Sequence, residues 1–194
     1  MATVRNGNKA ALLVVDVQAG VMKDAWEAPR VISNVLHAVE RARADGVPVI
    51  WVQHADDDLP RASPEWQWVP ELRPAQGEAM IHKQFNSSFE QTPLDDELAK
   101  VGATHIVLAG AASNWCIRAT AYGALERGYD LTLVEDAHTT GSIELDDGTR
   151  IEAPSVIREL NIAMSWLSYP GRTNRTAKAA AVDFAGLGTR TPTR

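Results

Sequence analysis

Three residues with reactive side chains each lie beyond a run of apolar residues. Asp16 directly follows LLVV, Lys83 directly follows AMIH, and Cys116 stands six residues after the end of IVLAG. Carboxylate, ammonium and thiol groups are the ones that proteins use for acid–base and nucleophilic catalysis. Because each apolar run reads as a strand, the three side chains are predicted to stand at or just beyond strand ends.

Cys116 is the only cysteine among 194 residues, so the chain forms no internal disulfide and no thiolate-rich zinc site. It is therefore either a buried filler or a nucleophile. A helix is predicted to begin near it, and a helix N-terminus and a nearby lysine both stabilise a thiolate. We therefore expect the pKa of Cys116 to lie below the ordinary value of about 8.5 for a free thiol.

Each of these residues also has a purely structural interpretation. An Asp at a strand end is often a cap or turn residue, a lone Lys is usually a solvated charge, and a lone Cys is usually a small core residue. Taken singly, the structural interpretation is favoured for each of Asp16, Lys83 and Cys116. Their joint position at the carboxyl ends of strands is what favours a functional site.

Short β-branched runs alternate with helical patterns along the chain, which is typical of βαβ units. Strands are predicted at 11–18, 47–53, 79–84, 104–110 and 130–137, and helices at about 29–45, from near 93, at about 114–128 and at about 153–168. The strands are continuously apolar, which indicates a parallel sheet covered by helices on both faces. We therefore predict a single Rossmann-like domain over 1–194, a three-layer α/β/α doubly wound sheet.

The C-terminal part of the chain allows fewer conclusions. The apolar stripe of the helix at 153–168 serves either the core alone or also a partner subunit. Residues 176–184 are predicted to add an edge strand, and 185–194 are predicted to form a flexible tail.

Composition narrows the class of partner. The net charge of −6 disfavours nucleic acid and anionic membranes, because both would repel the protein at long range. No apolar stretch approaches the roughly 20 residues that span a bilayer, and Asp16 interrupts the N-terminal apolar run too early for a signal peptide. We expect a cytoplasmic protein whose partner is a small molecule.

The motifs LLVVDVQ and HKQFNSSFEQTPLDDELAKVGATHIVLAGAASNWCIRATAYGALERGYDLTLVEDA resemble those of the isochorismatase-like cysteine hydrolases. Members carry an Asp at the end of the first strand, a Lys after the third, and a Cys in the pattern G-x-x-[ST]-x-x-C. Asp16, Lys83 and the segment from Gly110 to Cys116 match these features. The resemblance extends from about Ala10 to Tyr169, and the family includes nicotinamidases, carbamoyl-amide hydrolases, streptothricin hydrolases and isochorismatases.

The resemblance implies a role for each matched residue. Asp16 would accept the thiol proton and later activate water, Lys83 would balance the charges, and Cys116 would attack a carbonyl carbon to give a thioester. The backbone N–H groups of Ala112 and Cys116 would form the oxyanion hole. In the family, that arrangement depends on a cis peptide, which corresponds here to Ala111–Ala112. The expected reaction is hydrolysis of a small amide, lactam or carbamoyl compound.

Two subfamilies fit the sequence less well. Nicotinamidases of this family bind a divalent metal through an Asp-x-His pair, whereas His54 and Asp56 stand here in the reverse order. We therefore expect no metal and no other cofactor, with His54 a hydrogen-bonded residue that is open to substrate contact. Isochorismatases cleave a vinyl ether without needing a thiol, so Cys116 favours acyl transfer. Vinyl-ether hydrolysis and a non-catalytic binding module remain the alternatives.

Aromatic residues near these positions are candidates for the substrate pocket, with core packing as the equal alternative. They are Trp66 and Trp68 in the long connection at 55–77, together with Phe85 and Trp115. The acidic run 56–58 is either a solvated turn or an attractor of a cationic substrate such as streptothricin. The resemblance also implies a homodimer or homotetramer.

Overall fold

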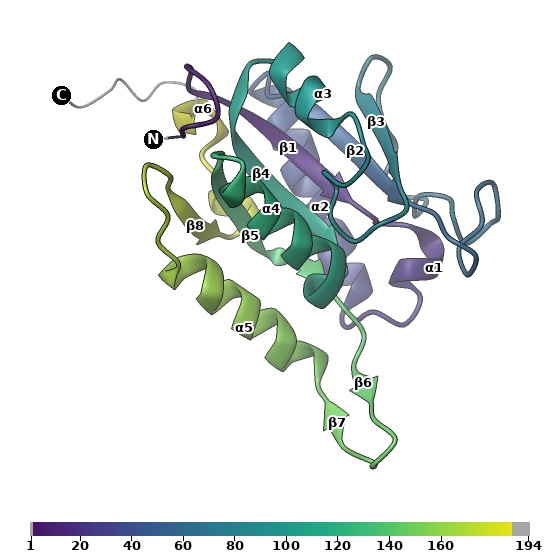
Figure 1. The fold of residues 1–194 in the computed structure, drawn as a ribbon. Helices are drawn as coiled ribbons and strands as arrows, with labels where there is room; N and C mark the ends of the chain where they lie inside the picture. The colour runs from purple at the N-terminus through teal and green to yellow at the C-terminus, as the bar shows by residue number, and fades with distance from the viewer. Residues whose placement is uncertain (1, 188–194) are drawn as a thin grey trace.

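The computed structural model describes residues 2–187. Its centre is a six-stranded sheet in the order β3-β2-β1-β4-β5-β8, in which all neighbouring strands are parallel (Figure 1). The strands of this sheet are β1 (Lys9–Val15), β2 (Val49–His54), β3 (Ala79–Lys83), β4 (Ala103–Ala111), β5 (Asp130–Thr139) and β8 (Asn174–Ala177). The chain builds outward from β1 to β3 and then returns to the other side of β1. Strand order therefore reverses between β1 and β4, where ligands bind in such sheets.

Helices cover both faces of the sheet (Figure 1). They are α1 (Ala19–Met22), α2 (Ala28–Ala44), α3 (Leu94–Lys100), α4 (Arg118–Glu126), α5 (Ala153–Trp166) and α6 (Phe184–Leu187), with a π turn η1 (Ser113–Ile117) and a 3-10 turn η2 (Ala179–Ala181). Side chains of β1 alternate between two cores. Leu12 and Val14 pack with α2 and α6, and Leu13 and Val15 pack with α3, α4 and α5. The predicted three-layer α/β/α fold is confirmed.

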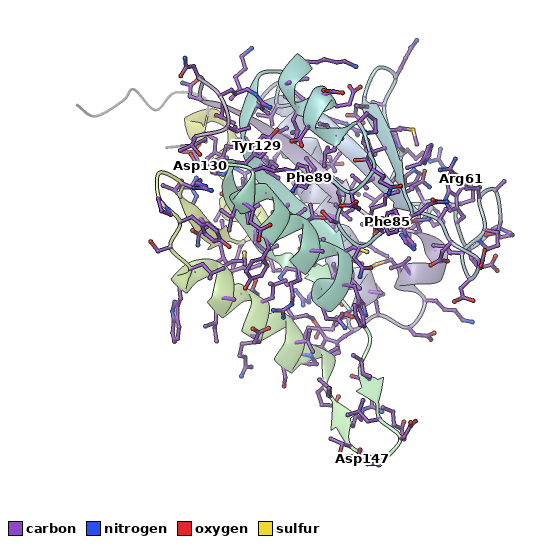
Figure 2. The ribbon with its side chains drawn as sticks, in the orientation of Figure 1. Arg61, Phe85, Phe89, Tyr129, Asp130 and Asp147 are labelled. Carbon is purple, nitrogen blue, oxygen red and sulfur yellow. The ribbon has the colours of Figure 1, made fainter. Side chains whose placement is uncertain are left out.

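Local structure departs from the sequence predictions in two places in the middle of the chain. The helix predicted at 114–128 begins as the π turn η1 and becomes regular only in α4. An antiparallel hairpin of β6 (Ile143–Glu144) and β7 (Arg150–Ile151) was not predicted, and it projects from the body with Asp147 at its tip (Figure 2). The helix predicted at 153–168 corresponds to α5.

The C-terminal prediction needs correction. The edge strand exists, but it is β8, which ends at Ala177 and so lies earlier than the predicted 176–184, while η2 and the first residue of α6 fall in that segment. The predicted tail at 185–194 is wrong for 185–187, because these residues belong to α6, whose Phe184 and Leu187 are buried in the core. The rest of that prediction lies outside the described residues. Over residues 2–187, none of the helices has the length and apolar character needed to cross a membrane.

Candidate active site

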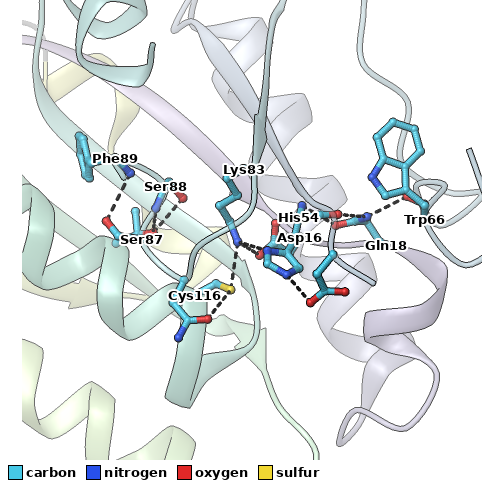
Figure 3. Close-up of polar contacts among 12 residues, drawn as sticks. Asp16, Gln18, His54, Trp66, Lys83, Ser87, Ser88, Phe89 and Cys116 are labelled. Atoms are coloured by element: carbon cyan, nitrogen blue, oxygen red, sulfur yellow. Dashed lines mark hydrogen bonds and ion pairs between the residues drawn. The ribbon is translucent and has the colours of Figure 1, made fainter. Parts of the chain in front are cut away.

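The fold brings Asp16, Lys83 and Cys116 together at the carboxyl ends of three strands. Lys83 Nζ lies 2.7 Å from Asp16 Oδ2 and 3.1 Å from Cys116 Sγ, so the ammonium group bridges the carboxylate and the thiol (Figure 3). Asp16 and Lys83 are each 1% exposed, and Cys116 is 8% exposed. Cys116 is therefore the most exposed member of the cluster.

Backbone geometry explains how β1 and β4 place these groups so close together. Asp16 has a φ of 53°, a left-handed conformation that turns the chain out of β1, while its N–H still donates to Val52 O at 2.8 Å. Gly110 pairs with Val15 in the sheet, and a Cβ at Gly110 would lie 1.9 Å from the Val15 carbonyl oxygen. Glycine at this position is thus required for the close approach of β4 to the strand that carries Asp16.

The turn that carries Cys116 begins directly after β4. The Ala111–Ala112 peptide is cis, as the family resemblance implied, and Ala112 O accepts hydrogen bonds from the N–H groups of Trp115 and Ile117. Cys116 lies within the resulting π turn η1. Turns of this kind are rare and are often found at functional sites. The assignment of the Ala112 and Cys116 N–H groups to an oxyanion hole stays a prediction.

Burial and mutual charge govern the ionisation of the cluster. Burial raises the pKa of Asp16, and the ammonium of Lys83 opposes that rise. Burial alone would lower the pKa of Lys83, but the neighbouring Asp16 and Cys116 raise it above its ordinary value. Lys83 is therefore an ammonium group at neutral pH, and Asp16 is a stronger base than an exposed carboxylate.

The expectation of a lowered pKa for Cys116 is wrong. Burial and the negative charge of Asp16 raise the pKa of this thiol to about 12, and Lys83 offsets only part of that rise. The helix N-terminus and the lysine are visible in the sequence, but the depth at which the thiol is buried is not. In the resting protein Cys116 is a neutral thiol beside a base, and not a preformed thiolate.

His54 adjoins this cluster at the end of β2. Its Nδ1 lies 3.3 Å from Lys83 Nζ, and its Nε2 lies 2.8 Å from Asp56 Oδ2 (Figure 3). An ammonium group only donates hydrogen bonds, so Nδ1 accepts and the Nε2 proton is donated to Asp56. His54 is thus a hydrogen-bonded residue, as predicted, and it also touches the candidate lysine.

Gln18 and Asn86 are two neighbours of the site that the sequence did not reveal. The Gln18 amide donates to His54 O at 3.0 Å and to Trp66 O at 2.9 Å, and it accepts from the His54 N–H at 2.9 Å. It therefore ties the end of β2 to the long connection. The exposed Asn86 reaches the site itself, with its Oδ1 3.9 Å from Cys116 Sγ. Only one feature of the sequence indicates that Asn86 belongs to the site, namely that it is a polar residue in the segment HKQFN, close to Lys83.

Comparison with known proteins agrees with this geometry. Residues 10–151 match the family model described as the isochorismatase domain. The chain belongs to the isochorismatase-like hydrolase family. It is 34% identical over 183 residues to a streptothricin hydrolase of Streptomyces noursei, covering 90% of this chain and 71% of that protein. It is 28% identical over 176 residues to a ureidoacrylate amidohydrolase of Klebsiella pneumoniae, covering 69% of this chain and 75% of the relative.

A solved isochorismatase from Pseudomonas putida has the same fold. Its TM-score with this chain is 0.79 at 26% identity, covering 92% of this chain and 93% of the other.

Within residues 2–187 of this isochorismatase-like protein, no group of three or more His, Cys, Asp or Glu side chains is arranged to hold a metal ion. The prediction of a homo-oligomer is untested, although Trp166 on α5 is 81% exposed.

The four aromatic candidates fall into two groups in this isochorismatase-like fold. Phe85 and Trp115 are exposed, and Phe85 and Lys83 line the same cavity of about 180 Å³. Arg61 and His82 also line that cavity, and Figure 2 shows Arg61 and Phe85 on the same side of the molecule.

The long connection between β2 and β3 contains the other two aromatic candidates, Trp66 and Trp68. Trp66 contacts His82 with ring centroids 5.5 Å apart and ring planes tilted by 38°, whereas Trp68 packs edge-on against the buried Trp51 at 5.0 Å. Trp68 thus has a packing role.

Proposed function

We propose that this chain is a cysteine-dependent hydrolase that cleaves an amide-like C–N bond of a small molecule through a thioester acyl-enzyme. The observation that carries the proposal is the position of Lys83 Nζ, 2.7 Å from the carboxylate of Asp16 and 3.1 Å from the sulfur of Cys116. Base, cation and nucleophile are within direct reach of one another. The relatives named above as a streptothricin hydrolase and a ureidoacrylate amidohydrolase support hydrolysis of this class.

The chemistry follows from the protonation states. Because Cys116 rests as a thiol, its proton passes to Asp16 as the sulfur bonds to the carbonyl carbon. The ammonium of Lys83 stabilises the ionised sulfur during this transfer. Collapse of the tetrahedral intermediate breaks the C–N bond, and Asp16 returns the proton to the departing nitrogen. Water then attacks the thioester, Asp16 takes a proton from it, and the acid is released with restoration of the thiol.

The acidic run 56–58 favours a cationic substrate. Asp56, Asp57 and Asp58 are exposed and begin two residues after His54, the last residue of β2, which contacts Lys83. Asp56 is engaged with His54, and the carboxylates of Asp57 and Asp58 add negative charge beside the site. We therefore propose a basic amide or lactam, such as streptothricin, as the substrate class.

The test is intact-protein mass spectrometry after brief exposure to streptothricin, ureidoacrylate or nicotinamide, in parallel with an assay for released amine or ammonia. The proposal predicts turnover of at least one compound and a mass increase equal to its acyl group. The increase should be absent in Cys116→Ser, with Asn34→Ala as a folded control whose side chain lies away from the cluster. Turnover of a vinyl ether without any covalent adduct, or amide turnover retained by Cys116→Ser, would overturn it.

A further inference from the structure

A second, largely buried polar cluster includes the start of the turn that carries Cys116. Ser113 Oγ is 2.8 Å from His138 Nδ1, and His138 Nε2 is 2.9 Å from Asn161 Oδ1. Ser113 is the first residue of η1, His138 is near the end of β5, and Asn161 is on α5. Ser113 and His138 are 0% and 1% exposed. The mechanism above makes no use of any of the three.

The direction of every hydrogen bond in this cluster is determined. The Asn161 amide donates to Glu135 O at 3.0 Å, which fixes its orientation and leaves Oδ1 as the acceptor. His138 Nε2 therefore carries a hydrogen that it donates to Asn161. In the neutral ring Nδ1 is then an acceptor, and the Ser113 hydroxyl donates to it. Burial lowers the pKa of His138 to about 4, which is consistent with a neutral imidazole at physiological pH.

The buried position of Ser113 excludes a nucleophilic role for its hydroxyl and indicates that the residue helps to hold η1 in place. Its hydroxyl is sealed from solvent and is directed to His138, so no substrate carbonyl can reach it. Ser113 nevertheless stands directly after Ala112 and three residues before Cys116. The chain of bonds through His138 to Asn161 thus connects the start of the nucleophile turn to β5 and α5.

We propose that His138, as the neutral Nε2–H tautomer, is a positioning residue that anchors η1 through Ser113 and so holds Cys116 Sγ against Lys83. The sulfur is 3.1 Å from Lys83 Nζ, and a shift of the turn by less than 1 Å would weaken that contact. The catalytic consequence rests on the proposed function, but the placement of the thiol does not depend on it.

Asn34 provides a matched control, because its side chain binds a backbone carbonyl of the same strand, β5. Its side-chain amide donates to Asp136 O at 2.7 Å, so it satisfies the carbonyl next to the one that Asn161 satisfies. It does so from α2, and it has no hydrogen bond with His138 or with η1. Removal of the Asn34 amide therefore tests the general cost of a lost bond to β5 without disturbing the anchor.

The experiment measures thiol placement without any substrate. Iodoacetamide modifies the sole cysteine, and its rate at neutral pH is followed by intact mass in His138→Leu, His138→Asn, Ser113→Ala and Asn34→Ala. Leu removes the acceptor for Ser113, whereas the Asn carbonyl can replace Nδ1. We expect alkylation to slow about tenfold in His138→Leu and Ser113→Ala, the effect of one unit in thiol pKa. His138→Asn should stay within about threefold of wild type and Asn34→Ala within about twofold, the scatter of an unaffected site.

The tautomer is tested independently by nitrogen-15 NMR of the wild-type imidazole, which distinguishes a protonated Nε2 from a protonated Nδ1. A protonated Nδ1 would overturn the proposal, and this result needs no variant to fold. Equal alkylation rates in Ser113→Ala and wild type would also overturn it. So would losses in all four variants that simply follow their melting temperatures. An unreactive substrate panel with these expected results would refute the proposed function and leave the anchor intact.

Discussion

Two polar clusters each include a residue of η1, and they differ in charge. The candidate catalytic cluster of Asp16, Lys83 and Cys116 consists of ionisable groups whose pKa values are all raised by burial or by one another. The anchoring cluster of Ser113, His138 and Asn161 is neutral, and each of its hydrogen bonds has a defined donor. Buried charges are costly and are poor stabilisers, whereas satisfied neutral groups fix a unique geometry. The comparison assigns reactivity to the first cluster and geometry to the second.

The largest expected effect is on Cys116 itself. Cys116→Ser should lower turnover of any amide substrate by about 1,000-fold or more, because a hydroxyl is a far weaker nucleophile under the same base. Folding should be retained, since oxygen replaces a sulfur of a residue that is still 8% exposed. Circular dichroism checks the fold, and steady-state assays check turnover. Near wild-type activity in the serine variant would show that Cys116 is not the nucleophile, and reactivity could then no longer be assigned to its cluster.

The next effect separates the two charged partners of the thiol. Asp16→Asn and Lys83→Ala should each lower turnover by about 100-fold to 10,000-fold, the range for loss of a general base. Groups that act as a unit lose their effect together, so the double variant should be little worse than either single one. Single-turnover kinetics on folded variants measures this. Additive losses would contradict a single catalytic unit.

Alkylation should move in opposite directions in the same two variants. The carboxylate of Asp16 raises the pKa of Cys116 and Lys83 lowers it. Asp16→Asn should therefore speed iodoacetamide modification by about tenfold, and Lys83→Ala should slow it by a similar factor, one unit of pKa in each case. A change of the same sign in both variants would show that structural damage, and not charge, controls the thiol.

The pH dependence of alkylation in the wild-type protein tests the raised pKa of Cys116 directly. A pKa of about 12 means that the thiolate fraction of Cys116 rises through the whole range from neutral to strongly alkaline pH. The alkylation rate should grow about tenfold for each pH unit between roughly 7 and 10, without the plateau that a free thiol shows above about 8.5. Glutathione under identical conditions is the control. A plateau of the alkylation rate near neutral pH would instead show that Cys116 is already ionised there, as expected from the sequence.

Much of the candidate catalytic cluster could be predicted from the sequence, and the anchoring cluster could not. Asp16 and Lys83 end apolar runs, so a local pattern already places them at one edge of the sheet. His138 lies in the same kind of strand but faces Asn161, which is 23 residues away on a helix. No spacing rule connects that pair. The raised pKa of Cys116 was missed for a similar reason, because burial depth depends on the packing of the whole domain.

Hairpin β6–β7 shows a different limit of sequence reasoning. Asp147–Gly148 is a common turn dipeptide, and it lies at the tip of this hairpin. The strands on either side contain two residues each, which is too short for an alternating pattern to be visible. A turn signal was therefore present, but no strand signal accompanied it.

The smallest expected effect is that of chelation, because both ring nitrogens of His54 are already engaged in hydrogen bonds within the protein. A neutral imidazole has one ring nitrogen with a free lone pair, and in His54 that nitrogen is Nδ1. It accepts a hydrogen bond from Lys83 Nζ at 3.3 Å, while Nε2 donates to Asp56 at 2.8 Å. Neither nitrogen is available as a ligand unless Lys83 or Asp56 moves away.

Turnover should therefore stay within about twofold of the untreated enzyme after prolonged incubation with EDTA or phenanthroline. An enzyme that depended on a bound zinc as its Lewis acid would lose its activity under this treatment. The matched control is the same treatment of a zinc-dependent hydrolase, which must lose activity in parallel. His54→Asn adds a second arm, because its carbonyl can still accept from Lys83 and should preserve most turnover, whereas His54→Leu should not. Activity lost on chelation and restored by zinc, together with inactive His54→Asn, would instead make His54 a metal ligand and Lys83 its neighbour.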